Sequence, residues 1–190
     1  MAQPLKIAVI VASTRPERVG PAVAEWVMAG TADREGASYT LVDLADQGLP
    51  LLDEPEPASS GNYTREHTKR WSALVDGFDG FVFVTPEYNR GIPGALKNAL
   101  DFLYAEWNDK AAAICCYGSS GGLRAAEQLK LVLGELQIAT VRSQVSISIY
   151  DDMTDFTTMS PRDYQERNRA SAFDQLERWA GALATLRSAG

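Results

Sequence analysis

Two kinds of hydrophobic pattern alternate along the chain. Short runs of apolar and β-branched residues, such as Leu5–Val11, are typical of buried strands, whereas apolar residues that recur every three or four positions predict helices with one face in the core. The runs predict strands at 5–11, 39–43, 80–85, 111–117 and about 141–149. The periodic segments predict helices at about 20–30, at 64–75, from Pro93 onward, around Ala126–Leu136 and from 160 through Leu183.

The strict alternation of five strands with five helices predicts an α/β fold, in which a parallel sheet is doubly wound with helices on both faces. Five strands in under 200 residues favour the flavodoxin-like strand order 2-1-3-4-5, so residues 1–190 are expected to form a single domain. In such sheets, ligands bind beyond the carboxyl ends of the strands, at the switch point between strands one and three. A site is therefore expected in the loops after strands one, three and four.

Two further segments carry local signals. Residues 44–63 are rich in Pro, Gly, Ser and Asp, which predicts a long loop that is either functional or a tolerated surface insertion. The sequence Ser160-Pro161-Arg162-Asp163 resembles a capping box with proline in the first turn, so the last helix is expected to begin there.

Composition and charge narrow the class of protein. Apolar residues make up 45% and charged residues 23% of the 190 residues, which is typical of a globular protein, and no apolar run approaches the ~20 residues of a membrane span. The N-terminus leads directly into a strand-like run, and Cys115 and Cys116 are neighbours that cannot link distant segments, so we expect a cytoplasmic protein without a secretory signal. A net charge of −7 argues against nucleic acid or an anionic membrane as partner.

The loop after the first strand has the groups that bind a phosphate. Ser13 and Thr14 supply hydroxyls, backbone N–H groups precede a helix, and Arg15 and Arg18 can add charge-assisted hydrogen bonds. Neither G-x-G-x-x-G nor G-x-x-x-x-G-K-[ST] is present, so a monophosphate fits better than a dinucleotide or a nucleoside triphosphate. The alternative interpretation is that Ser13 or Thr14 caps the helix and that the arginines are solvated.

The next two loops could hold a flat ring. Residues 85–94 contain two prolines that stiffen the loop and Tyr88, which offers an aromatic surface, although an ordinary turn with a solvent-facing tyrosine is the alternative. Residues 117–122 contain Gly118, Gly121 and Gly122, which expose backbone N–H groups and let a planar ligand lie against the main chain.

Taken together, the three loops resemble the NADPH-dependent FMN reductases, a family of flavodoxin-like flavoproteins that includes quinone, azo-dye and chromate reductases. The resemblance extends from the first strand to about Ile149. Its matching segments are Ser13-Thr14-Arg15-Pro16 with Arg18 and Gly20, then Pro86-Glu87-Tyr88-Asn89, then 93–101, and then 118–122. Ala12 departs from the family, which often has glycine at that position.

The resemblance implies one tightly held FMN per subunit. Residues of the first loop would surround the phosphate, residues 86–89 would line the ring edge largely through backbone groups, and residues 117–119 would flank the ring. The candidate FMN-binding residues are Ser13, Thr14, Arg15, Arg18, Val19, Gly20, Pro86, Glu87, Tyr88, Asn89, Tyr117, Gly118, Ser119 and Gly121.

The resemblance also implies a reaction and an assembly. Hydride would pass from NAD(P)H, the co-substrate, to FMN, and the reduced flavin would then reduce a quinone, a free flavin, an azo compound or a similar small acceptor in a ping-pong cycle. No side chain is assigned as catalytic because the chemistry takes place on the cofactor. The family commonly forms homodimers or dimers of dimers. Residues 102–107 are the candidate interface, or else a core edge with a half-exposed tryptophan.

The remaining residue patterns do not indicate a different site or function. His67, in a polar helix start, is expected to face water, and one histidine with two adjacent cysteines cannot form a zinc site. Asp151, Asp152 and Asp155 are expected to form a solvated loop. A flavodoxin-type electron carrier is the alternative function, but its phosphate loop usually lacks arginine. A phospho-receiver domain is rejected because the required aspartates are missing after strands one and three.

Overall fold

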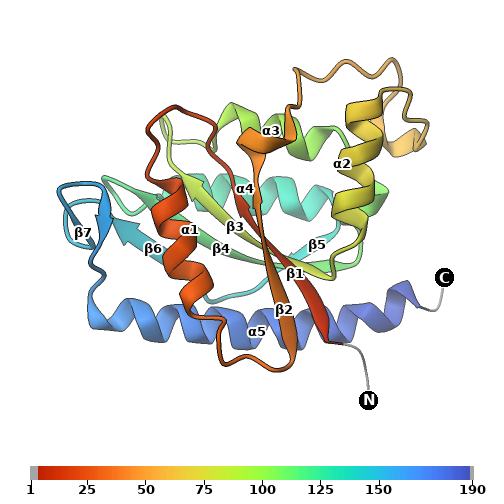
Figure 1. The fold of residues 1–190 in the computed structure, drawn as a ribbon. Helices are drawn as coiled ribbons and strands as arrows, with labels where there is room; N and C mark the ends of the chain where they lie inside the picture. Colours follow the sequence, from red (N-terminus) through yellow and green to blue (C-terminus); the bar gives the residue numbers. More distant parts are fainter. Residues whose placement is uncertain (1–3, 189–190) are drawn as a thin grey trace.

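The computed structural model describes residues 4–188 and consists of one parallel sheet between two layers of helices (Figure 1). The strand order is β2-β1-β3-β4-β5, with β6 paired to β4 beyond the end of β5. The strands are β1 (Leu5–Val11), β2 (Ala37–Asp43), β3 (Gly80–Pro86), β4 (Lys110–Gly118), β5 (Ile138–Thr140) and β6 (Val145–Ser148). The predicted fold class and strand order are therefore confirmed.

The helices cover the two faces of the sheet unequally. Helices α1 (Gly20–Ala29) and α5 (Asp163–Arg187) cover one face, while α2 (Glu66–Asp76), α3 (Gly94–Asp101) and α4 (Leu123–Glu135) cover the other (Figure 1). The segment 44–63 is a loop with short 3₁₀ turns at Leu44–Gln47 and Ala58–Ser60, and a third such turn lies at Ala105–Trp107. Between β6 and α5 a small antiparallel hairpin forms from β7 (Met153–Thr154) and β8 (Thr158–Met159).

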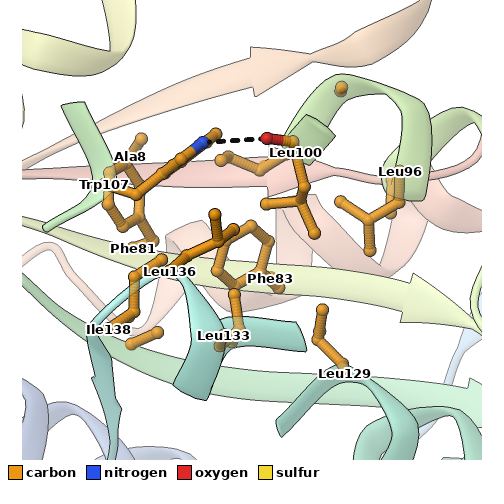
Figure 2. Close-up of a cluster of buried hydrophobic side chains, with 14 of the residues drawn as sticks. Ala8, Phe81, Phe83, Leu96, Leu100, Trp107, Leu129, Leu133, Leu136 and Ile138 are labelled. Atoms are coloured by element: carbon orange, nitrogen blue, oxygen red, sulfur yellow. Dashed lines mark hydrogen bonds between the residues drawn. The ribbon is translucent and has the colours of Figure 1, made fainter. Parts of the chain in front are cut away.

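The core on the α2–α4 side is built around Trp107 (Figure 2). Trp107 is fully buried, packs against Phe81 and Trp71, and donates a hydrogen bond from Nε1 to the carbonyl of Leu100 at 3.2 Å. Phe102 and Leu103 are buried as well. Phe102, Leu103 and Trp107 of the candidate interface 102–107 are therefore part of the core of their own chain and cannot contribute to an interface. The alternative of a half-exposed tryptophan is wrong.

The last predicted strand is also corrected. It was expected to be continuous over about 141–149, but it starts at Ile138 and is interrupted between β5 and β6. At the interruption the N–H of Ser143 bonds to the side-chain oxygen of Gln175 on α5 at 3.0 Å and does not join the sheet.

The predicted start of the last helix is corrected as well. Helix α5 begins at Asp163 after Arg162, so Ser160 does not cap it, and the N–H of Arg162 is bonded by the carboxylate of Asp152 at 3.1 Å. Of the helices in residues 4–188, none has both the length and the apolar character to cross a membrane.

Candidate functional site

A pocket of about 350 Å³ lies at the carboxyl ends of β1, β3 and β4, where the strand order switches from β1–β2 to β1–β3. Its volume is in the range of small-molecule sites, which is roughly 300–1,000 Å³. All three loops that the sequence singled out contribute to it. The residues that line the pocket are Arg15, Arg18, Val19, Pro86, Glu87, Tyr88, Tyr117, Gly118, Ser119, Ile149 and Phe156.

The first loop leaves the start of α1 open. Val19 is the N-cap, and no described side chain caps the helix or places an acidic group in its first turn. Ser13 is buried, and its Oγ shares a 2.8 Å hydrogen bond with the hydroxyl of Tyr88 and accepts one from the N–H of Arg15 at 3.3 Å. The capping interpretation for Ser13 and Thr14 is therefore wrong. Uncapped N–H groups at a helix start favour an anion.

The two arginines of this loop differ in whether their charge is paired with a carboxylate. Arg18 forms an ion pair with Asp43 at the end of β2, and both side chains are largely buried. Its Nε is buried and has no hydrogen-bond partner within residues 4–188. Arg15 is exposed and forms no ion pair with any described residue. The pocket therefore contains one unpaired positive charge and one unsatisfied buried donor, and an anionic oxygen would satisfy both.

The loop after β3 is shaped by a two-residue turn. Tyr88 and Gly91 exchange two backbone hydrogen bonds of 3.0 Å, with Asn89 and Arg90 between them at φ values of 50° and 70°. This left-handed pair is the backbone of a type I′ turn. The turn holds Tyr88 at the pocket wall and leaves Asn89 exposed at the tip, outside the pocket lining.

The carboxylate of Glu87 caps α4. It accepts hydrogen bonds from the N–H groups of Arg124 at 3.0 Å and Ala125 at 3.3 Å, and it forms an ion pair with the Arg124 guanidinium. Burial acts to raise the pKa of Glu87, but Arg124 and the two N–H groups outweigh it and lower the pKa below its usual value. Glu87 is thus an ionised structural group and not a free acid or base.

The glycine-rich loop lies flat against β4. Gly121 and Gly122 have φ values of 70° and 73°, and a Cβ on Gly122 would come within 2.6 Å of the backbone nitrogen of Tyr117. A Cβ on Gly20 would come within 2.9 Å of the Tyr117 hydroxyl, so glycine lets α1 approach this ring. Burial is the main cause that raises the pKa of the Tyr117 phenol, and the nearby Tyr88 raises it further. Tyr117 is therefore neutral, and its buried side chain lines the pocket.

The structure brings most of the predicted residues together. Ser13 and Gly20 lie directly behind the lining, in contact with Tyr88 and Tyr117. Thr14 and Gly121 line neighbouring pockets instead, and Asn89 lies at the turn tip.

Sequence reasoning missed Ile149 and Phe156. Phe156 is 55% exposed at the tip of the β7–β8 hairpin with a φ of 58°. The two-residue strands of this hairpin are too short to leave a periodic signal.

The acidic cluster after β6 is corrected in part. Asp151 and Asp155 are exposed, but Asp152 is fully buried. It accepts hydrogen bonds from the N–H of Ser148, from the backbone and guanidinium of Arg162, and from the amide of Gln165. Burial acts to raise the pKa of Asp152, but these donors, Arg162 first, lower it. Asp152 thereby fixes the base of the hairpin that carries Phe156.

Two smaller predictions have different outcomes. Cys115 and Cys116 are buried in β4 as expected. His67 does not simply face water, because it is half-buried, bonds to Asp53 at 2.8 Å and contacts the ring of Phe102 edge-on.

Comparison with known proteins gives consistent matches. The model of the NADPH-dependent FMN reductase family matches residues 5–152. An NAD(P)H-dependent FMN reductase of Schizosaccharomyces pombe is 44% identical over 149 residues, covering 77% of this chain and 74% of that protein. A second one, from Saccharomyces cerevisiae, is 37% identical over 148 residues, covering 72% and 78%. Among solved structures, the NAD(P)H:acceptor oxidoreductase FerB of Paracoccus denitrificans superposes with a TM-score of 0.71 at 20% identity, covering 94% of this chain and 98% of that one, which demonstrates the shared fold.

Proposed function

The chain belongs to the NADPH-dependent FMN reductase family, and we propose that the 350 Å³ pocket described above is its FMN site. The family match includes the three loops at the ends of β1, β3 and β4. The protein is thus an FMN-dependent NAD(P)H oxidoreductase.

One observation carries the assignment: the buried Nε of Arg18 has no partner within the described residues, next to the uncapped start of α1. In a protein of net charge −7, such a site is suited to a phosphate that would otherwise be repelled. Arg15, the Arg18 Nε and the N–H groups at the start of α1 would hold the FMN phosphate. The hydroxyl of Ser13 would orient this phosphate.

The backbone of residues 86–88 and 117–119 would hold the ring. When bound, FMN would supply the redox chemistry, which is hydride acceptance from NAD(P)H and electron transfer to an acceptor. The chain itself binds and orients: Tyr117 and Tyr88 contribute aromatic rings to the pocket lining, and Ile149 and Phe156 contribute apolar side chains. Glu87 is committed to α4, so no proton-transferring side chain is assigned.

The acceptor is proposed to be a small planar molecule such as a quinone, a free flavin or an azo compound. The partly exposed rings of Tyr88 and Phe156 at the pocket support this, as do relatives named quinone reductase in Pseudomonas putida and NADPH azoreductase in a Bacillus strain. Donor and acceptor would use the same opening and therefore bind in turn. Initial rates at varied donor and acceptor should give parallel double-reciprocal lines, whereas intersecting lines would contradict a shared site.

The assembly is proposed to be a homodimer or a dimer of dimers in the cytoplasm. The exposed leucines Leu51 and Leu52 after the first 3₁₀ turn support an interface, and the two buried free thiols suit a reducing compartment. Light scattering during size-exclusion chromatography should give a mass of two or four chains. A mass of one chain at every concentration would contradict the proposal.

The experiment that tests the proposed function is identification of the bound flavin. Heat should release a flavin from the purified or reconstituted protein that chromatography identifies as FMN. FAD, or no flavin after reconstitution, would refute the assignment. Rapid mixing of the FMN-loaded protein with NAD(P)H alone should then bleach the flavin, and the absence of bleaching would favour an electron carrier.

A further inference from the structure

A second pocket, of about 330 Å³, lies on the far side of the glycine-rich loop. It is a solvent-open pocket bordered by residues 119–121, by β6 and by the first turns of α5. β6 and α5 are in contact with each other. Ser119 lines both this pocket and the FMN pocket. A molecule that reaches past Ser119 could therefore occupy both spaces at once.

The chemistry of this second pocket differs from that of the first. The side-chain oxygen of Gln144 is buried in its wall and has no hydrogen-bond partner within residues 4–188. Such an acceptor is costly unless a ligand donates to it. Tyr164 offers a ring that is 39% exposed, and the Arg162 guanidinium lies 5.0 Å from its centroid. These two flat groups provide a stacking surface for a planar base.

The charges in the pocket do not favour an anion. Arg162 is the one cation among the described lining residues, and Asp152 already binds it through two hydrogen bonds of 2.9 Å. A carboxylate oxygen of Asp151 also lies 3.7 Å from a nitrogen of the same guanidinium. The positive charge is thus offset, and the pocket is suited to an uncharged polar aromatic group.

We propose that this second pocket binds the adenosine half of the nicotinamide dinucleotide donor. The inference rests on the proposed function, because the nicotinamide must reach FMN in the first pocket. The rest of the bound donor must then extend out of that pocket. An adenine has a face that can stack on Tyr164 and an exocyclic amine that can donate to Gln144. Ribose hydroxyls can donate to the hydroxyl oxygens of Ser146 and Ser148 in β6, where Ser146 already donates its own proton to the Gly121 carbonyl at 2.8 Å.

The 2′-phosphate that distinguishes NADPH from NADH would find no unpaired cation among the described residues of this pocket. We therefore expect the 2′-phosphate to add no affinity here.

The test compares a whole donor with a truncated one. In FMN-loaded protein, Tyr164→Ala should raise KM for NADH about tenfold, since base–aromatic stacking of this kind is worth about that much. KM for reduced nicotinamide mononucleotide, which lacks the adenosine, should not change. Trp179→Ala is the matched control, because Trp179 is a similarly exposed aromatic on the same helix and lines none of the three pockets. Equal effects on both donors, or no effect on NADH, would overturn the proposal.

A binding measurement tests the pocket independently of turnover. Calorimetric titration with adenosine should give binding that Gln144→Leu and Tyr164→Ala both weaken, while 2′-AMP binds no more tightly than adenosine. Absence of adenosine binding to the parent protein, or adenosine binding unaffected by both variants, would refute the adenosine site. Failure of the proposed function would instead appear as a protein that takes up no FMN, and the adenosine titration would still decide the question of the second pocket.

Discussion

Arg15 is the side chain whose removal should most clearly weaken FMN binding. Arg15 lines the pocket beside the open start of α1, and its charge is not matched by an ion pair among the described residues. A phosphate carries nearly two negative charges. A hydrogen bond to a charged group contributes ~1.5–3 kcal/mol, and every ~1.4 kcal/mol is tenfold in affinity. Arg15→Ala should therefore weaken FMN binding by roughly 10- to 150-fold while the fold is retained.

Arg18 requires a matched comparison, since its removal would also leave Asp43 unpaired. The double variant Arg18→Ala/Asp43→Asn removes the charge pair together and keeps an oxygen that can accept from the N–H of Ala45. It should cost less affinity than Arg15→Ala, because the charge of Arg18 is already offset by Asp43.

Fluorescence titration of the apoproteins with FMN measures these losses, and riboflavin, which lacks the phosphate, is the control ligand. Arg15→Ala should leave riboflavin affinity unchanged. If it binds FMN as tightly as the parent protein, or loses riboflavin equally, the phosphate role of Arg15 is wrong.

Three further outcomes are expected. Gly122→Ala should lower the free energy of unfolding by about 1–3 kcal/mol or more, because the φ of 73° and the 2.6 Å approach to the Tyr117 nitrogen exclude a Cβ. Thermal melting measures this loss. The control Gly134→Ala, where a Cβ would meet open space on α4, should be at least as stable as the parent. Burial lowers the pKa of Lys110 in the folded protein to about 8, whereas in the unfolded chain this pKa is ~10.4. The contribution of Lys110 to the free energy of unfolding should therefore rise between pH 8 and ~10.4. Urea titrations should find this rise absent in Lys110→Met. Phe156→Ala should raise KM for a planar quinone but not for ferricyanide, and equal changes would argue against a contact with the Phe156 ring.

Much of the fold follows from signals that are local in sequence. The apolar run of Leu5–Val11 and the periodic apolar positions of α3 and α4 each identify an element without reference to the rest of the chain. Alternation and crossover handedness then determine the sheet. The loop residues Arg15, Tyr88 and Ser119 could be predicted because they follow strands whose ends must meet.

The errors involve contacts that local sequence does not encode. Asp152 is buried because Arg162 and Gln165, at the start of the next helix, fold back onto it. Phe156 reaches the pocket because Asp155 and Phe156 adopt left-handed conformations that non-glycine residues rarely have. The core role of Trp107 depends on Phe81 and Trp71, which come from distant segments.

The most direct test of the central claim is a crystal structure of the protein with FMN bound. The account predicts the phosphate at the start of α1, within hydrogen-bond distance of the Arg18 Nε, and the ring against the backbone of residues 86–88 and 117–119. A phosphate bound away from α1, or a flavin in either of the other two pockets, would contradict it.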